Sequence, residues 1–234
     1  TGRKDQVATD DKIKTASTIK TAQHRHTEKI QGTVIVPNEN SFWVLYGQHT
    51  KPTFLEDAGN GQRPQRDNAL KHVKQWRVCL DIGSNIGQWT RPLARRFDSV
   101  VCFEPNPNFR ECFDKNIKES NVTLWPYGLS DREHTAQQDF NSTMLKEGEG
   151  DIECKTLDSF QLEQIDFIKI DVDGFEVPLL NGARETLCNN NAVVNIEMKR
   201  DKRSGTVAKC ESILKDLGYG FVQRIKSDEI WLKS

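Results

Sequence analysis

The chain has 234 residues, of which 29% are charged, and its formal net charge is −1 at pH 7. This balance excludes the global basic field that marks many nucleic-acid-binding proteins, although a local basic patch remains open. No apolar run approaches the roughly 20 residues that a membrane-spanning helix requires. The chain begins with Thr1 and shows no apolar signal core, so we expect a fragment or a processed form.

The six cysteines include no CxxC pair, so the spacing of a zinc finger is missing. Cys79 and Cys102 fall in apolar runs, where we expect them to act as small buried hydrophobes. Reduced thiols in an intracellular protein are favoured over a disulfide framework. We therefore expect a cytoplasmic protein.

The N-terminal part, residues 1–67, reads as an extension of the main domain. We expect a helix over 12–30, or a loosely ordered segment, and then two short strands at 33–37 and 41–46. Residues 47–67 are rich in Gly, Pro, Asn and Gln and predict a loop. A long loop ahead of a core strand often serves as a lid or a binding loop.

From residue 68 to residue 234, strands alternate with helices, which indicates one domain. The predicted helices cover 68–74, 88–97, 108–118, 176–187 and 205–217. The predicted strands cover 78–82, 100–103, 122–127, 167–170 and 192–196. A polar excursion at 130–146 is expected to form a hairpin or an irregular loop. Two last strands, 221–225 and 229–232, are joined by a turn so short that they must pair antiparallel.

This pattern predicts an α/β fold with a doubly wound parallel sheet, helices on both faces and a C-terminal antiparallel hairpin. A seven-stranded, Rossmann-like sheet of this kind is similar to that of class I methyltransferases. In such sheets, ligands bind beyond the carboxyl ends of the strands.

The run Val-Cys-Leu-Asp-Ile-Gly-Ser-Asn-Ile-Gly at 78–87 holds the first candidate site. A buried strand, a glycine turn and a helix in this order form a corner that binds nucleotide-like cofactors. Gly83 permits the sharp turn, and Gly87 lets the backbone lie close to a ligand. Asn85 tolerates a positive φ better than other non-glycine residues do. Taken alone, such a turn is as often only a turn.

Two acids at strand ends narrow the choice of cofactor. Glu104 ends the second strand, about 20 residues beyond the glycine turn, where an acid accepts hydrogen bonds from both ribose hydroxyls. Asp81 ends the first strand, and we expect it to face the middle of the cofactor. There it would repel a pyrophosphate and attract an ammonium or a sulfonium. The charges therefore favour S-adenosylmethionine over NAD.

Several segments resemble, in the same order, the FkbM family of methyltransferases. They are Cys-Leu-Asp-Ile-Gly-Ser-Asn-Ile-Gly at 79–87, Val-Val-Cys-Phe-Glu-Pro-Asn-Pro at 100–107, Gly-Leu-Ser-Asp at 128–131, Thr-Leu-Asp-Ser-Phe at 156–160, and Asp-Phe-Ile-Lys-Ile-Asp-Val-Asp-Gly-Phe-Glu at 166–176. The segment at 61–67, Gly-Gln-Arg-Pro-Gln-Arg-Asp, also resembles FkbM-like proteins of marine viruses. That second resemblance implies a viral protein in a host cytoplasm.

The family resemblance implies methyl transfer from S-adenosylmethionine to a hydroxyl oxygen, with S-adenosylhomocysteine as the product. Carried over by position, Glu104 holds the ribose, and the methionine part is lined by Asp81, Gly83, Asn85 and Gly87. The other cofactor positions implied are Gln65, Ser84, Pro105, Asn106, Leu129, Ser130 and Asp131. Ser84 and Asn85 depart from a plain GxGxG loop, which leaves the shape of this loop open.

Methyl transfer to an alcohol needs an aligned donor and acceptor and a base. Asp171, which follows the fourth strand, is the first candidate, and Asp173 and Glu197 come second. As an alternative, Asp171 and Glu197 hold a divalent cation, although two acids make a thin site and we do not favour a metal. Asp173 is otherwise a cap for the next helix. Lys169 shares a face with Asp171 and is expected to form an ion pair.

The acceptor is expected to be a small molecule or a glycan, and two other functions stay open. Asp171, Lys199 and Glu229 supply part of the Lys-Asp-Lys-Glu set of RNA ribose 2′-O-methyltransferases, and the basic run at 199–203 offers contacts for phosphates. A protein that binds the cofactor without turning it over is the third possibility. It would keep cofactor binding and show no methyl transfer.

Overall fold

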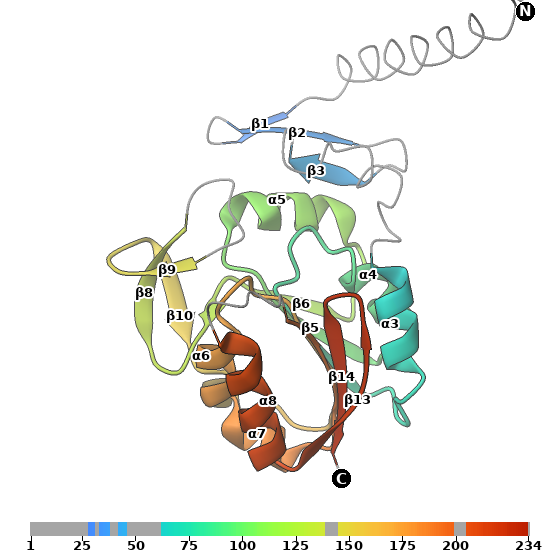
Figure 1. Ribbon diagram of the computed structural model, residues 1–234. Helices are drawn as coiled ribbons and strands as arrows, with labels where there is room; N and C mark the ends of the chain where they lie inside the picture. The colour runs from blue at the N-terminus through green and yellow to red at the C-terminus, as the bar shows by residue number, and fades with distance from the viewer. Residues whose placement is uncertain are drawn as a thin grey trace, which may run out of the picture.

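The computed structural model describes residues 28–30, 33–37, 42–45, 62–138, 145–198 and 205–233. Its main sheet has seven strands in the order β13-β14-β12-β11-β4-β5-β6 (Figure 1). The strands are β4 (Val78–Ile82), β5 (Ser99–Phe103), β6 (Val122–Trp125), β11 (Ile165–Ile170), β12 (Val193–Glu197), β13 (Tyr219–Ile225) and β14 (Asp228–Lys233). Five strands are parallel, and β14 runs antiparallel to β12 and β13. The predicted fold class is confirmed, including the C-terminal hairpin.

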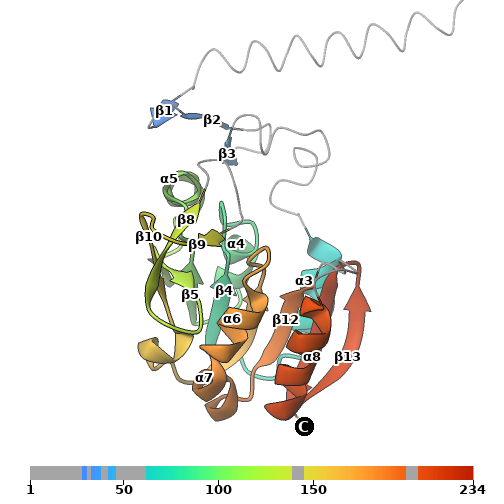
Figure 2. The same ribbon diagram turned by 60° about the vertical axis from the view of Figure 1, so that its left-hand side comes forward.

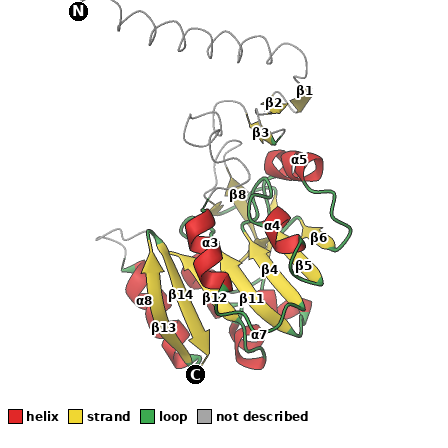
Figure 3. Ribbon diagram, turned by 90° about the vertical axis from the view of Figure 1, so that its right-hand side faces the viewer, coloured by secondary structure: helices red, strands yellow, loops and turns green. Residues whose placement is uncertain are grey.

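Helices cover both faces of this sheet. Successive side chains of a strand point to opposite faces, so the buried strands present an apolar surface on each side. Leu80 and Ile168 pack on one face under α6 (Glu176–Asn181), α7 (Arg184–Asn189) and α8 (Thr206–Asp216). Cys79 and Phe167 pack on the other under α3 (Arg63–Leu70), α4 (Thr90–Ala94) and α5 (Pro107–Asn116). Figures 2 and 3 show the two layers. Cys79 and Cys102 are fully buried, as predicted.

Two predicted helices differ from the structure in their limits. Helix α3 begins at Arg63, within the predicted loop, since Pro64 lies in its first turn, where proline is favoured. The expected domain boundary at 67/68 therefore falls inside a core helix. The predicted helix at 176–187 is divided into α6 and α7 around Gly182. A Cβ on Gly182 would lie 1.9 Å from the carbonyl oxygen of Ser130, so only glycine fits at the break, and the Asp158 carboxylate accepts from the Glu185 and Thr186 amides at the start of α7.

The polar excursion after β6 belongs to a second, four-stranded sheet. Strand β8 (His134–Gln138) pairs antiparallel with β9 (Leu145–Glu147), so the predicted hairpin is present. The order β7-β10-β8-β9 is completed by β7 (Gly128–Leu129) and β10 (Ile152–Lys155), which we did not predict. A short 3₁₀ helix, Leu157–Phe160, then leads back to the main sheet. The small core of this sheet includes Phe175, beside the loop after β11.

A third sheet of three antiparallel strands lies at the N-terminal side, next to α5 (Figure 1). It consists of β1 (Glu28–Ile30), β2 (Thr33–Pro37) and β3 (Trp43–Leu45). The two strands expected at 33–37 and 41–46 are thus confirmed as β2 and β3. Residues 28–30 are strand rather than the end of the expected helix, and the rest of that helix lies outside the described residues. No helix in the described ranges is long and apolar enough to cross a bilayer.

Asn116, at the end of α5, joins the third sheet to the glycine turn. Its Nδ2 donates to the carbonyl oxygens of Trp43 (2.9 Å) and Ile86 (2.8 Å), and its Oδ1 accepts from the Trp43 amide at 2.6 Å. The side chain is buried. One amide group therefore connects strand β3 to the segment that we expect to bind the cofactor.

We expect Asn116→Ala to lower the free energy of unfolding by about 2 kcal/mol or more, because it leaves buried backbone groups of Trp43 and Ile86 without partners. Urea unfolding of the whole chain measures this change. Asn189→Ala, at an exposed asparagine in α7, is the matched control and should change stability by less than about 0.5 kcal/mol. Equal stability of the two variants would contradict the linking role of Asn116.

Candidate active site

A cavity of about 350 Å³ lies beyond the carboxyl ends of β4, β5 and β11. This is the edge of a parallel sheet where ligands bind, and the volume falls in the range of small-molecule sites. The turn after β4 and the end of β5 form one wall, and the loop after β11 forms another. The β8–β9 hairpin adds Gln138 and Leu145.

The glycine turn has the backbone geometry that its residues predict. Gly83, Asn85 and Gly87 all have positive φ, of 73°, 51° and 90°. The amides of Gly83 and Ser84 both donate to the carbonyl oxygen of Phe103, at 3.0 and 3.1 Å, and so fix the turn to β5. A Cβ on Gly83 would lie 1.9 Å from the carbonyl oxygen of Asp171. The turn therefore packs directly against the loop after β11.

Glu104 lines the cavity beside this turn and is only 4% exposed. Its carboxylate accepts hydrogen bonds from the amides of Asn85 and Asn106, both at 2.8 Å. Burial raises the pKa of Glu104 to about 7, although the two amides and the positive charge of Lys169 oppose this shift. A carboxylate has further acceptor positions beyond these two bonds, so Glu104 is able to receive the hydroxyls of a ribose.

We expect the affinity for S-adenosylhomocysteine to fall as the pH drops below about 7, by up to about tenfold per pH unit. Hydroxyl donors bind the charged form of Glu104, and its raised pKa makes this form scarce at lower pH. Calorimetric titrations between about pH 5.5 and 8.5 measure the trend. Glu104→Gln should bind more weakly and show no such dependence. A wild-type affinity that stays constant over this range would contradict the assignment.

Asp81 lies behind the turn rather than in the cavity, contrary to our expectation that it faces the cofactor. It is fully buried, accepts a hydrogen bond from Thr90 Oγ1 at 2.6 Å and pairs with Lys169 Nζ at 3.3 Å. Lys169 occupies the paired position on β11, and a buried carboxylate requires such a counter-charge. The ion pair expected for Lys169 is therefore confirmed, and it is Lys169 that lines the cavity.

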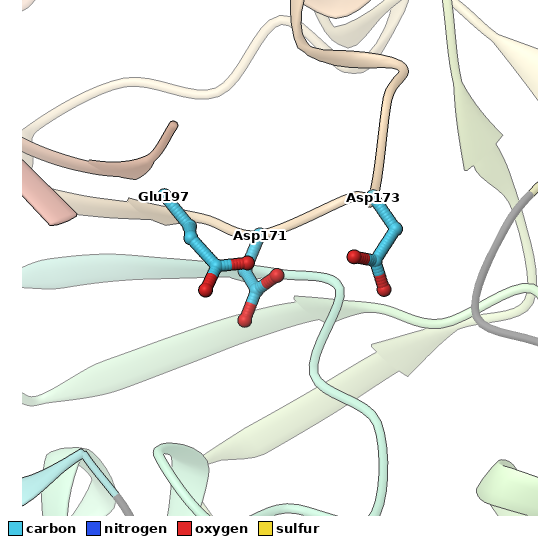
Figure 4. Close-up of side chains that lie close together, drawn as sticks. All are labelled: Asp171, Asp173 and Glu197. Atoms are coloured by element: carbon cyan, nitrogen blue, oxygen red, sulfur yellow. The ribbon is translucent and has the colours of Figure 1, made fainter. Parts of the chain in front are cut away.

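Three carboxylates gather at the carboxyl ends of β11 and β12, and two of them line the cavity. One oxygen each of Asp171, Asp173 and Glu197 lies within 4.8 Å of the other two (Figure 4). Asp171 and Asp173 line the cavity, and Glu197 accepts a hydrogen bond from Ser227 Oγ at 2.9 Å. Such a group is able to take up a proton, to bind an ammonium or to hold a cation. The three predicted catalytic acids thus meet in space.

Asp173 is not the cap of the helix that follows. The N-terminal capping position of α6 is Phe175, without a side-chain hydrogen bond. Instead, Glu176 Oε1 accepts from the Gly174 amide at 2.9 Å. The capping role that we considered for Asp173 is therefore wrong, because Glu176 folds back on the turn in its place.

The remaining predicted cofactor residues divide into two groups. Ser84, Pro105 and Leu129 line the cavity, together with Gly83, Asn85 and Glu104. The others lie outside the lining: Gly87 packs against Ile117, Asn106 caps α5, Ser130 donates its amide to Lys155, Asp131 pairs with Arg132, and Gln65 is buried in α3 and hydrogen-bonds Asp228.

Sequence reasoning missed an aromatic group in the lining, made of Phe103, Phe109 and Tyr127. Phe103 ends β5 and Tyr127 follows β6, so their place at strand ends was a usable signal. Gln62 also lines the cavity and accepts a hydrogen bond from Trp89 Nε1 at 2.5 Å. Pro64 marks the start of α3 and could have located Gln62. Gln138 and Leu145 belong to the excursion after β6, a segment that we expect to contribute to the acceptor pocket but that contains no motif to single out either residue.

The sheet order, the antiparallel β14 and the cavity beside Glu104 define the fold of a class I methyltransferase. The methyltransferase FkbM domain matches residues 81–221, more than half of the chain. The chain belongs to the FkbM methyltransferase family.

Individual proteins are also similar to this chain. The chain is 28% identical over 138 residues to the hexuronic acid methyltransferase AglP of Haloferax volcanii. This alignment covers 53% of this chain and 57% of the relative. The crystal structure of a methyltransferase FkbM from Methylobacillus flagellatus is similar with a TM-score of 0.50 and 18% identity, over 68% of this chain and 44% of that one. A precorrin-6y C5,15-methyltransferase from Geobacter metallireducens also has a TM-score of 0.50, with 13% identity over 84% and 95%.

The chain spans little more than half the length of the curated relative that it matches. The two solved structures, both below 25% identity, show the fold alone. The resemblance of residues 61–67 to viral proteins stays a prediction.

Proposed function

We propose that the protein transfers a methyl group from S-adenosylmethionine to a hydroxyl of a sugar or another small molecule. The observation that carries this proposal is a single cavity with Glu104 and the glycine turn on one wall and Asp171 and Asp173 on the other. A donor and an acceptor held in one cavity meet the main requirement of an in-line displacement. The relative from Haloferax volcanii, a hexuronic acid methyltransferase, supports a sugar as the acceptor.

The residues of the cavity fit S-adenosylmethionine. Glu104 offers its carboxylate to the ribose, and Tyr127, Phe103 and Phe109 offer apolar faces to the adenine. Ser84 Oγ is buried and has no hydrogen-bond partner among the described residues, so it is available to a polar group of the ligand. When bound, the cofactor supplies a methyl group that is already activated by a sulfonium.

The charge argument for this cofactor now rests on Asp171 and Asp173 instead of Asp81. Both line the cavity, whereas the charge of Asp81 is compensated by Lys169 at 3.3 Å. Carboxylates in the lining attract an ammonium or a sulfonium and repel a pyrophosphate. The cavity therefore suits S-adenosylmethionine better than NAD.

Asp171 is proposed to take the proton of the acceptor hydroxyl, with Asp173 and Glu197 beside it. The grouped carboxylates favour a hydroxyl acceptor over a carboxylate acceptor, which they would repel. If the acceptor is a hexuronic acid, its carboxylate would have to point away from this wall. A divalent cation held by the three acids would lower the pKa of the hydroxyl instead, and loss of activity in chelator with recovery on adding Mg²⁺ or Mn²⁺ would indicate that route.

One of the three residues considered for an RNA ribose 2′-O-methyltransferase, Glu229, lies away from the cavity. Glu229 is fully buried, bonds to Arg224, and accepts from Trp231 Nε1 at 3.1 Å. It is engaged on the terminal hairpin and does not line the cavity. Lys199 lies outside the described residues. Asp171 therefore has no Glu229 beside it in the cavity. This favours a small-molecule or glycan acceptor over an RNA.

Calorimetry with S-adenosylmethionine, S-adenosylhomocysteine and NAD tests the cofactor. We expect the two sulfur ligands to bind and NAD not to bind. Failure of both sulfur ligands would reject the proposal. A methyl-transfer assay would then compare neutral glycosides, hexuronic acids and capped RNA. Cofactor binding without transfer to any of them would favour the non-catalytic reading.

A further inference from the structure

The ammonium of Lys169 lies where the two walls of the cavity meet. Its side chain is 4% exposed, and it lines the cavity from the end of β11. Nζ donates to the carbonyl oxygen of Gly83 at 2.6 Å and to that of Ile82 at 3.3 Å. It also lies 3.3 Å from Asp81 Oδ1 and 4.0 Å from Asp171 Oδ2. One charged group thus contacts the glycine turn, its buried counter-ion and the candidate base.

The hydrogen bond from Lys169 to the Gly83 carbonyl fixes the start of the glycine turn, which contacts Glu104 through Asn85. Two residues further on, the Asn85 amide donates to the Glu104 carboxylate at 2.8 Å. Asn85 holds a positive φ of 51°, a conformation that asparagine tolerates but that is less favourable than the right-handed region, so contacts that fix the turn help to maintain it. A charged donor on a backbone carbonyl is among the stronger hydrogen bonds in proteins. Lys169 is therefore placed to hold the turn in the shape that presents Glu104 to a ligand.

The charge of Lys169 also affects the potential in the cavity. The acids that interact electrostatically with it come from several elements of the sheet and the following loop: Asp81, Glu104, Asp171 and Asp228. Asp81 is fully buried, so its charge is screened little by water. Without the charge of Lys169, the electrostatic potential in the cavity would become more negative.

We propose that Lys169 is a positioning residue that fixes the glycine turn through the Gly83 carbonyl and offsets the negative charge facing the methyl donor. This role rests on the proposed function, because it concerns the binding of S-adenosylmethionine and its product. It differs from a merely structural role, in which Lys169 only compensates the buried charge of Asp81. The two ligands separate these roles, since S-adenosylmethionine carries a sulfonium charge that S-adenosylhomocysteine lacks.

The experiment measures the affinities of both ligands by calorimetry for the wild type and three variants. Lys169→Met should weaken S-adenosylhomocysteine binding about tenfold or more, because the turn loses its anchor. It should weaken S-adenosylmethionine less, so that the ratio of the affinities moves about fivefold toward the sulfonium ligand. Lys169→Arg keeps the charge and should leave the ratio unchanged, with a partial loss of affinity for both ligands.

The double variant Lys169→Met/Asp81→Asn separates anchoring from charge compensation. It contains no buried unpaired charge, so it should fold even if Lys169→Met alone does not. We expect it to keep the wild-type ratio and to bind S-adenosylhomocysteine as weakly as the single variant does. Wild-type affinity in the double variant would overturn the anchoring role. Equal weakening of both ligands by Lys169→Met would overturn the charge role.

Hydrogen exchange of the ligand-free protein gives a readout that does not depend on the proposed function. Peptides covering residues 78–87 should exchange faster in Lys169→Met and in the double variant than in the wild type, and unchanged exchange would refute the anchor. If the wild type bound neither ligand, the proposed function would fail while this readout still decided the role of Lys169 in the turn. Lys215→Met, at an exposed lysine of α8, is the matched control and should match the wild type.

Discussion

Asp171→Asn is expected to lower kcat for methyl transfer by about 10²–10⁴-fold, the contribution typical of a general base. The asparagine has nearly the same shape but cannot accept the proton of the acceptor hydroxyl. Because Glu104 and the aromatic wall are unchanged, affinity for S-adenosylhomocysteine should stay within about threefold of the wild type. The measurements are steady-state kinetics with the acceptor found by screening and calorimetry with the product.

A matched control for this variant is Asp216→Asn, which replaces an exposed aspartate at the end of α8 and should behave as the wild type. Asp173→Asn and Glu197→Gln test the other two acids of the cluster. A wild-type rate in Asp171→Asn, with a large loss in Asp173→Asn or Glu197→Gln, would move the base to that residue. Equal, moderate losses in all three, together with dependence on Mg²⁺ or Mn²⁺, would indicate a shared cation.

Gly83→Ala is expected to abolish measurable cofactor binding and to lower the free energy of unfolding by about 4 kcal/mol or more. The new Cβ would lie 1.9 Å from the Asp171 carbonyl oxygen, and φ at this position is 73°. A change of rotamer cannot relieve a clash between a Cβ and a backbone oxygen, so the turn or the loop after β11 must move. Chemical unfolding and calorimetry with S-adenosylhomocysteine measure the two effects.

Gly218→Ala separates the cost of the backbone conformation from the cost of the clash. Gly218 has a comparable φ of 82°, and a Cβ there would meet no atom within 4 Å. This control should lose only about 1–2 kcal/mol, the cost of the left-handed conformation. If both variants lost the same stability, the close approach of Gly83 to Asp171 would not be what requires glycine.

The order of the main-sheet elements could be predicted because buried parallel strands are continuous apolar runs that are easy to separate from amphipathic helices. Strands β4 and β2 were even placed with their observed limits. The break between α6 and α7 was missed because its surroundings come from distant parts of the chain: Gly182 lies against Ser130, 52 positions away. Local sequence does not contain such a contact.

The candidate site was predicted in part for the same reason. Strand ends located Glu104, Asp171 and Glu197, since the carboxyl ends of parallel strands share one edge of the sheet. The expectation that Asp81 faces the cofactor was wrong, because a position in a strand does not reveal which side chain supplies the counter-charge. Lys169 supplies it from the neighbouring strand. The walls contributed by Gln62 and Gln138 depend on segments that fold back from elsewhere in the chain.

The hairpin of β8 and β9 has a consequence for how this scaffold changes its acceptor. It touches the cavity through Gln138 and Leu145, while its own core with Phe175 lies apart from the main sheet. The glycine turn, in contrast, cannot shift without moving the loop that carries Asp171. If the hairpin contacts the acceptor, acceptor range and donor binding depend on separable parts of the chain. We then expect a hairpin grafted from another family member to reshape one wall of the cavity while Glu104 and Gly83 stay in place.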